Sequence, residues 1–362
     1  MAEAPSLVRD GYPARASRCG ALASVAVLLI LLFTACAPAR LQALDPEDPP
    51  MPRFEPAENR FVSFDGARLG LTVWPAAGGA PDLVIVGLHG MNDYANAFHM
   101  AAPWWAKRGV TTYAYDQRGF GRSPGRGIWP DEDLLREDLR TAVEIARRRH
   151  PEARIAVVGI SMGAAVAMTA FASERPPGAD RLILSGPGLR GWGALPVLYR
   201  VSLWTSVRMR PGWIVTPPRR FVKIMPSDNL EMLRRAGRDK LRLFENRIDQ
   251  VHGVVALMER AHDRADELPG GTPTLLSYGA NDIVIPPGAM ARTAPALPGH
   301  VRTVYYEDGY HMLLRDLQAE TVFADYLAFL EAPDAPLPSG EGPLPWRQTG
   351  TARYPASAAL AD

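Results

Sequence analysis

The sequence predicts an α/β protein whose mostly parallel, doubly wound sheet carries helices on both faces. Short apolar runs alternate with helical segments along most of the 362 residues. The run Leu83–Leu88 is apolar almost throughout, as expected of a strand that is buried on both faces. The pentapeptide Gly159-Ile160-Ser161-Met162-Gly163 joins an apolar run to an alanine-rich run. Strand, G-x-S-x-G and helix in that order are the context of a nucleophile elbow.

Each predicted element follows from its own pattern. Residues 61–64 and 69–74, separated by Asp65-Gly66, predict a hairpin at the start of the sheet. Leu135, Leu139, Ala142 and Ala146 recur at helical spacing, which predicts a helix over 131–150 with acids early and arginines late. The remaining predicted strands are 83–88, 111–115, 155–158, 182–184, 274–278 and 301–305, and a final helix covers about 316–330.

The stretch 188–269 interrupts the alternation of strands and helices. Its first half is rich in aromatic and apolar side chains, and its second half, about 230–265, is charged and predicts helix. An insertion here would lie above the carboxyl ends of the sheet. It predicts a helical cap that lines an apolar acyl pocket, a small satellite core, or both at once.

Composition narrows the class of protein. Hydrophobic residues make up 47% and charged residues 22%, with a net charge of +1, which is typical of a globular protein and argues against a nucleic-acid partner. The two cysteines, Cys19 and Cys36, both fall near the amino terminus. We therefore expect a globular part without disulfides.

The amino-terminal residues predict a targeting signal. Arginines precede an apolar run over 21–33, which is too short to span a bilayer comfortably and is followed by Thr34-Ala35-Cys36. Residues 32–36 resemble a bacterial lipobox, so we expect 1–36 to be a signal peptide with Cys36 lipidated and the protein anchored in the cell envelope. Plain secretion and an uncleaved anchor are the alternatives.

Proline-rich segments suggest the domain boundaries. Residues 37–57 are rich in proline and acid and predict an extended tether. Residues 333–362 are rich in Pro, Gly, Ser and Ala and predict a disordered tail. The expected globular domain is therefore 58–332.

Three polar residues form the candidate catalytic set. With a G-x-S-x-G elbow the partners follow in the order serine, acid, histidine. Ser161 is the predicted nucleophile, and His311 is the predicted base because its loop opens at the carboxyl end of the sheet. Asp282 follows a neighbouring strand and would orient the imidazole; Asp308 is the alternative acid.

Two backbone amides are candidates for an oxyanion hole. The amide of Met162 follows the nucleophile directly. The second should come from the loop that follows the strand 83–88, and Met91 is favoured there. Gly90 or Asn92 would serve if the loop is shifted by one residue.

These residues lie in ordered blocks that resemble the α/β-hydrolase fold. The chain is similar to its monoglyceride lipase and lysophospholipase branch, the serine aminopeptidase S33-type hydrolases. The matching blocks are Leu88-His89-Gly90, Tyr115-Asp116-Gln117-Arg118-Gly119-Phe120-Gly121-Arg122-Ser123, Gly159–Gly163, Gly279-Ala280-Asn281-Asp282 and Gly309-Tyr310-His311. The resemblance implies a helical cap and hydrolysis of acyl-lipid esters such as monoacylglycerols or lysophospholipids. Within the second block we interpret Asp116 and Arg118 as loop-shaping residues.

The expected function is therefore a serine ester hydrolase that needs no metal, organic cofactor or obligate protein partner. A serine peptidase of the same fold is the nearest alternative, although it would need a carboxylate in the cap to hold a substrate amine. A halide-displacing enzyme is disfavoured because it needs an aspartate where Ser161 stands. From another class, a lipidated envelope protein that binds without turnover would keep the fold alone.

Overall fold

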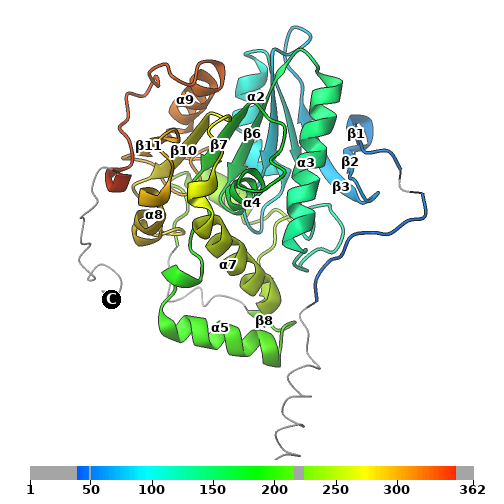
Figure 1. The fold of residues 1–362 in the computed structure, drawn as a ribbon, viewed down its shortest axis with the longest axis vertical. Helices are drawn as coiled ribbons and strands as arrows, with labels where there is room; N and C mark the ends of the chain where they lie inside the picture. The colour runs from blue at the N-terminus through cyan, green and yellow to red at the C-terminus, as the bar shows by residue number, and fades with distance from the viewer. Residues whose placement is uncertain (1–38, 49, 216–223, 348–362) are drawn as a thin grey trace, which may run out of the picture.

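The computed structural model describes residues 39–48, 50–215 and 224–347, and its nine-stranded sheet confirms the predicted fold class (Figure 1). The strand order is β1-β2-β3-β5-β4-β6-β7-β10-β11. The strands are β1 (Arg53–Glu55), β2 (Arg60–Val62), β3 (Arg68–Trp74), β4 (Leu83–Leu88), β5 (Val110–Tyr115), β6 (Arg154–Ile160), β7 (Arg181–Ser185), β10 (Thr274–Gly279) and β11 (Arg302–Tyr306).

The sheet is antiparallel at one edge and parallel elsewhere. The predicted hairpin is confirmed as β2 and β3, and β3 pairs antiparallel with β5. From β5 to β11 every pair is parallel. Strand β4 lies between β5 and β6, so the chain leaves β4 in one direction and later returns to its other side. Ligands of open parallel sheets bind at the carboxyl ends of strands at such a switch point.

Strand β4 is buried on both faces, as its apolar run predicts. Val84 and Val86 belong to the core cluster shared with helices α3 (Glu132–Arg149) and α4 (Met162–Phe171). Leu83 and Ile85, which alternate with them, belong to the cluster shared with helices α2 (Ala101–Ala106) and α9 (Ala319–Glu331). The period of two along a strand therefore divides one apolar run between two cores.

The helices form two layers around the sheet (Figure 1). They are α2 (Ala101–Ala106), α3 (Glu132–Arg149), α4 (Met162–Phe171), α8 (Pro287–Thr293) and α9 (Ala319–Glu331). Helix α3 confirms the predicted helix, and the side chain of Asp131 caps it by accepting a hydrogen bond from the amide of Asp133.

The insertion between β7 and β10 contains three helices and a two-stranded ribbon among its described residues. These are α5 (Val197–Met209), α6 (Leu230–Ala236), α7 (Ile248–Asp263), β8 (Ile214–Val215) and β9 (Asn246–Arg247). Helix α7 packs against α4, and α5 packs on α7 through a small cluster that includes Leu203, Val207 and Val255. In Figure 1, α5 lies at the outer end of this arrangement, with α7 between it and the sheet.

Two predicted boundaries are wrong. The tail expected from residue 333 is folded up to Arg347: Leu344 and Trp346 are buried in the core, and the amide of Tyr305 donates to the carbonyl of Gly342. Apolar side chains are sparse in this segment, but Trp346 packs edge-on against Tyr278 of β10 and Tyr305 of β11. The tether expected over 37–57 ends earlier, because β1 begins at Arg53.

Residues nearer the amino terminus also contact the domain. The amide of Leu41 donates to the carbonyl of Trp129, and the carbonyl of Leu41 accepts from the amide of Asp131. Within the described ranges, no helix has the length and apolar character needed to cross a membrane.

Candidate active site

Ser161 stands on a strained turn between β6 and α4. Its backbone angles, φ 53° and ψ −115°, lie in a region that residues other than glycine rarely adopt. Neighbouring glycines permit the turn, since a Cβ at Gly163 would lie 2.5 Å from the carbonyl oxygen of Leu88. A Cβ at Gly159 would lie 2.7 Å from the Cα of Ala164. The motif therefore lets α4 start directly against β4 and β6.

Backbone hydrogen bonds hold this turn against the loop after β7. The amide of Ser161 donates to the carbonyl of Ser185 over 2.9 Å, and the carbonyl of Ser161 accepts from the amide of Gly188 over 3.0 Å. Both backbone polar groups of a buried residue are thereby satisfied. The hydroxyl is left as the group that the turn presents.

The structure brings Ser161, His311 and Asp282 together. The Nε2 of His311 lies 3.0 Å from the Oγ of Ser161, and its Nδ1 lies 2.7 Å from the Oδ2 of Asp282. A carboxylate only accepts, so Nδ1–H donates to Asp282. Nε2 is then free to accept the serine proton. The arrangement can activate a hydroxyl nucleophile and stabilise the imidazolium that results.

Backbone amides of its own loop fix the carboxylate of Asp282 beside the imidazole of His311. The Oδ1 of Asp282 accepts the amides of Val284 and Ile285, each over 2.9 Å, and its side chain is fully buried. Those bonds orient the other oxygen, Oδ2, toward His311. Asp308, the alternative acid, is not the partner of His311.

The loop after β4 lies directly beside the nucleophile. A Cβ at Gly90 would lie 3.1 Å from the Cβ of Ser161, and the amide of Asp93 donates to the carbonyl of Gly90, which closes a turn around Met91. Among the described residues, neither the Met91 amide nor the Met162 amide donates to a backbone or side-chain acceptor. Met162 is also the first residue of α4, where amides have no acceptor within the helix.

Sequence reasoning did not assign a role to His89, which precedes this loop. It is fully buried, and its Nε2 accepts the amide of Gln117 over 2.9 Å. Its Nδ1–H therefore donates to the carbonyl of Gly90 over 2.8 Å. Burial lowers the pKa of His89, which favours this neutral form. The pair His89-Gly90 directly after a strand was the sequence feature from which this role could have been predicted.

The loop after β5 is shaped by buried ion pairs. Arg118 binds Asp65 and Asp138, each through both carboxylate oxygens, at 2.7–2.8 Å. Asp116 accepts from the amide of Ala95 and from Arg122. The interpretation of Asp116 and Arg118 as loop-shaping residues is confirmed.

Two further expectations concern lipidation and metals. Cys36 lies outside the described residues. In the part of the chain that the structure describes, no group of three or more His, Cys, Asp or Glu side chains is arranged to hold a metal ion.

The fold and the geometry around Ser161 define an α/β-hydrolase. Residues 79–318 match the family described as "Serine aminopeptidase, S33". The chain therefore belongs to the serine aminopeptidase S33 family, as its ordered sequence blocks predict, and it is a hydrolase.

Known relatives agree with this assignment. A monoacylglycerol lipase of Mycolicibacterium smegmatis is 27% identical over 292 residues, which are 76% of this chain and 96% of that protein. A monoacylglycerol lipase structure from Paleococcus ferrophilus covers 72% of this chain and 98% of its own, at a TM-score of 0.59 and 21% identity. A carboxyl esterase from Bacillus coagulans gives a TM-score of 0.61 and 21% identity, covering 75% of this chain and 96% of its own. The two structures establish likeness of fold.

Proposed function

We propose that the protein is a serine ester hydrolase that acts on acyl-lipid esters of the monoacylglycerol or lysophospholipid type. The observation that carries the proposal is the hydrogen-bonded series Ser161–His311–Asp282, with distances of 3.0 and 2.7 Å. A series of this kind beside two free backbone amides provides the groups that acyl transfer requires.

In the proposed mechanism the Oγ of Ser161 attacks the ester carbonyl while Nε2 of His311 takes its proton. The carbonyl oxygen becomes an oxyanion that accepts the amides of Met91 and Met162. Collapse of this intermediate breaks the ester C–O bond, and His311 returns the proton to the departing alcohol. Water then attacks the acyl-enzyme by the same path, which releases a fatty acid and restores the Ser161 hydroxyl.

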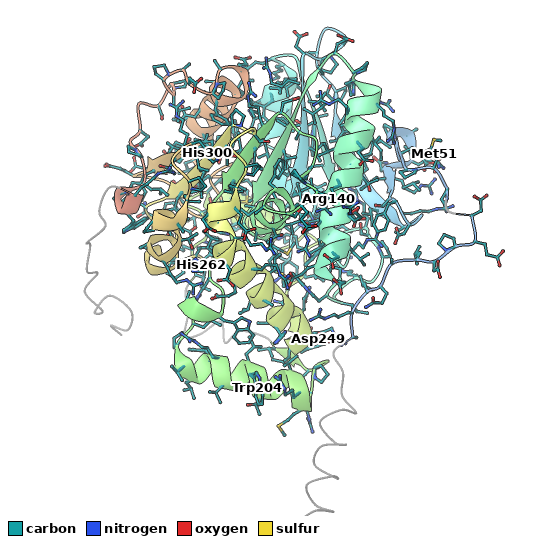
Figure 2. The ribbon with its side chains drawn as sticks, viewed as in Figure 1. Met51, Arg140, Trp204, Asp249, His262 and His300 are labelled. Atoms are coloured by element: carbon teal, nitrogen blue, oxygen red, sulfur yellow. The ribbon has the colours of Figure 1, made fainter. Side chains whose placement is uncertain are left out.

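The surface of the insertion supports a lipid substrate. Helix α5 leaves Leu198 78% exposed, Tyr199 64% and Trp204 51%. Trp204 lies on the helix at the outer end of the molecule (Figure 2). Exposed apolar and aromatic side chains on one helix are typical of a surface that rests on a lipid interface. We propose that this insertion is a cap that draws acyl lipids toward Ser161.

Charge also separates ester from peptide substrates. An aminopeptidase must hold the positive amine of its substrate, which favours a nearby carboxylate. Residues 188–227, the half of the insertion that contains α5, include no Asp or Glu. Their arginines favour neutral or anionic lipids instead, so the proposal stays with esters although the family takes its name from an aminopeptidase.

A substrate panel tests the proposal. Monoacylglycerols, lysophospholipids, p-nitrophenyl esters of graded chain length and aminoacyl amides are offered to the wild-type protein and to Ser161→Ala. We expect turnover of the lipid esters by the wild type and none above background by the variant, with melting temperatures within a few degrees. Preferential cleavage of the aminoacyl amides, or ester turnover retained by Ser161→Ala, would contradict it.

We further propose that lipidation of Cys36 anchors the protein in the cell envelope, on the strength of the lipobox-like sequence 32–36. The variant Cys36→Ser of the full chain should move from the membrane fraction to the soluble fraction and lose the lipid mass. Unchanged membrane association without a lipid adduct would point to an uncleaved anchor.

A further inference from the structure

One buried carboxylate, Asp93, lies where the insertion meets the two loops that flank Ser161. Its Oδ2 accepts Nη2 of Arg315 at 2.6 Å and lies 3.4 Å from Nη1 of Arg242. Asp93 belongs to the loop after β4, Arg315 follows His311 by four residues, and Arg242 belongs to the insertion. Three segments that are distant in sequence therefore meet at one side chain.

The segment around Arg242 is fixed in place by its backbone. The amide of Leu243 donates to the carbonyl of Asn92 over 3.0 Å. Arg126 donates to the carbonyls of Lys240, Leu241 and Arg242 at 2.7–2.9 Å. Segment 240–243 is therefore held between the loop after β5 and the loop that carries Met91.

The remaining contacts bind the same loops to the insertion. Tyr94 donates its hydroxyl hydrogen to Asp239 over 2.7 Å. On the other loop, the amide of Met312 donates to the carbonyl of Pro226 over 2.9 Å. These bonds connect the insertion to the loop that carries Met91 and to the loop that carries His311. We therefore expect a shift of the insertion to move the Met91 amide relative to His311.

When the insertion is docked, two cations, Arg315 and Arg242, face the single carboxylate of Asp93. Burial alone would raise the pKa of Asp93, but Arg315 and Arg242 lower it below its ordinary value. The Nη1 atom of Arg242 is buried, has no hydrogen-bond partner among the described residues and faces Asp93, although the Arg242 side chain as a whole is only partly buried. Its interaction with Asp93 depends on distance more than on hydrogen-bond geometry, since no hydrogen bond is formed.

We propose that Arg242 is a positioning residue for acyl transfer: it couples the docked insertion, through Asp93, to the loop that presents the Met91 amide. Arg242 does not touch the reacting atoms. It holds the Asp93 turn in the position from which Met91 can donate to the oxyanion. This inference rests on the proposed ester hydrolysis and adds that the insertion controls the rate of chemistry as well as access.

The variant Arg242→Met tests the coupling without leaving a buried charge unpaired, since Asp93 keeps Arg315. We expect kcat for p-nitrophenyl butyrate to fall about tenfold to a hundredfold, part of the effect of removing one oxyanion donor, with KM changed less than about threefold. The lysine of Arg242→Lys keeps a charge near Asp93 and should recover most of kcat. Arg235→Met is the matched control, because Arg235 lies in the same insertion and pairs with Glu231 at the exposed surface.

Binding of a boronic acid inhibitor distinguishes a displaced Met91 amide from a nonspecific loss of structure in the Arg242 variant. Its adduct with a serine hydroxyl carries an oxyanion-like oxygen, so its Ki should rise by the same factor as kcat falls, while the Ki of a fatty-acid product should stay unchanged. A kcat equal to that of the wild type, or a lowered kcat with unchanged boronate affinity, overturns the inference. If Arg242→Met does not fold, Arg242→Gln is measured by the same criteria.

Failure of the underlying proposal has a different signature. If wild-type protein neither hydrolyses the ester nor binds the boronate, the proposed function is wrong. If the wild type does both and Arg242→Met matches it, only the coupling is wrong.

Discussion

The central strand of the sheet buries its apolar side chains, whereas the outer helix of the insertion exposes most of them. All six residues of β4 are buried, whereas α5 leaves most of its apolar residues exposed. The sheet and its loops hold Ser161, His311 and Asp282 at fixed distances by backbone hydrogen bonds. The insertion carries the exposed surface on α5, packs against α4 through apolar residues of α7, and contacts the loops beside the site through a few polar residues. The comparison shows that the sheet and its loops supply the reacting groups, while the insertion supplies the exposed surface for which we propose lipid contact and the Arg242 contact for which we propose a positioning role.

The largest expected effect is on the sheet side, at Asp282. In Asp282→Asn the amide oxygen can keep the bonds from Val284 and Ile285, while the amide nitrogen faces His311. An NH₂ group donates to Nδ1, which forces the proton onto Nε2 and removes the acceptor for Ser161. We expect kcat to fall by about 10⁴-fold with little change in KM. Asp308→Asn is the control and should stay within about threefold of the wild type; equal losses in both variants would contradict the assignment.

The next effect concerns the stability of the sheet loops. Arg118→Met leaves Asp65 and Asp138 buried without their cation, so we expect the free energy of unfolding to fall by about 3–5 kcal/mol. The exposed pair Arg175–Glu137 is the control, and Arg175→Met should cost less than about 1 kcal/mol. Urea unfolding measures both. Similar losses would mean that the Arg118 cluster does not stabilise the fold.

Asp316 gives the sheet side a pH dependence. Its Oδ2 accepts the amide of Tyr310, next to His311, and burial raises its pKa to about 6 from an ordinary 3.8. The folded state therefore binds the proton more tightly, and this group's contribution to stability falls as the pH rises from about 4 through 6. Asp316→Asn should gain on the order of 2–3 kcal/mol relative to the wild type between pH 4 and pH 7. Parallel stability profiles would show that Asp316 does not titrate in this range.

The smallest effect belongs to the insertion. Leu198→Glu places a charge on the exposed face of α5, and binding to anionic vesicles should weaken about tenfold, near the free energy of burying one leucine. Met51→Glu is the control, because Met51 is equally exposed (77%) and lies away from α5 in Figure 2. Protein that lacks residues 1–36 is used for both variants, so that the proposed lipid anchor does not contribute to binding. Equal weakening would show that α5 does not contact the lipid surface.

Local patterns predicted most of the sheet and the residues around Ser161. The β4 run, the elbow glycines and the loop positions of Asp282 and His311 each depend on a few neighbouring residues. The docking of segment 240–243 could not be predicted, because Arg242 and Asp93 are 149 residues apart (242 − 93) and a charged helical pattern conceals the break between α6 and α7. The burial of Trp346 could not be predicted for a similar reason: its proline-rich surroundings suggest disorder, while the side chains that it packs against, Tyr278 and Tyr305, lie on strands distant in sequence.

The site of reaction with a fluorophosphonate tests the role of Ser161 as nucleophile most directly. Folded wild-type protein is incubated with the probe, digested, and its peptides are analysed by mass spectrometry. We expect one adduct, on Ser161, that is absent from Ser161→Ala and forms much more slowly in Asp282→Asn. An unlabelled wild type, or a label that persists in Ser161→Ala, would contradict the assignment of Ser161 as the nucleophile.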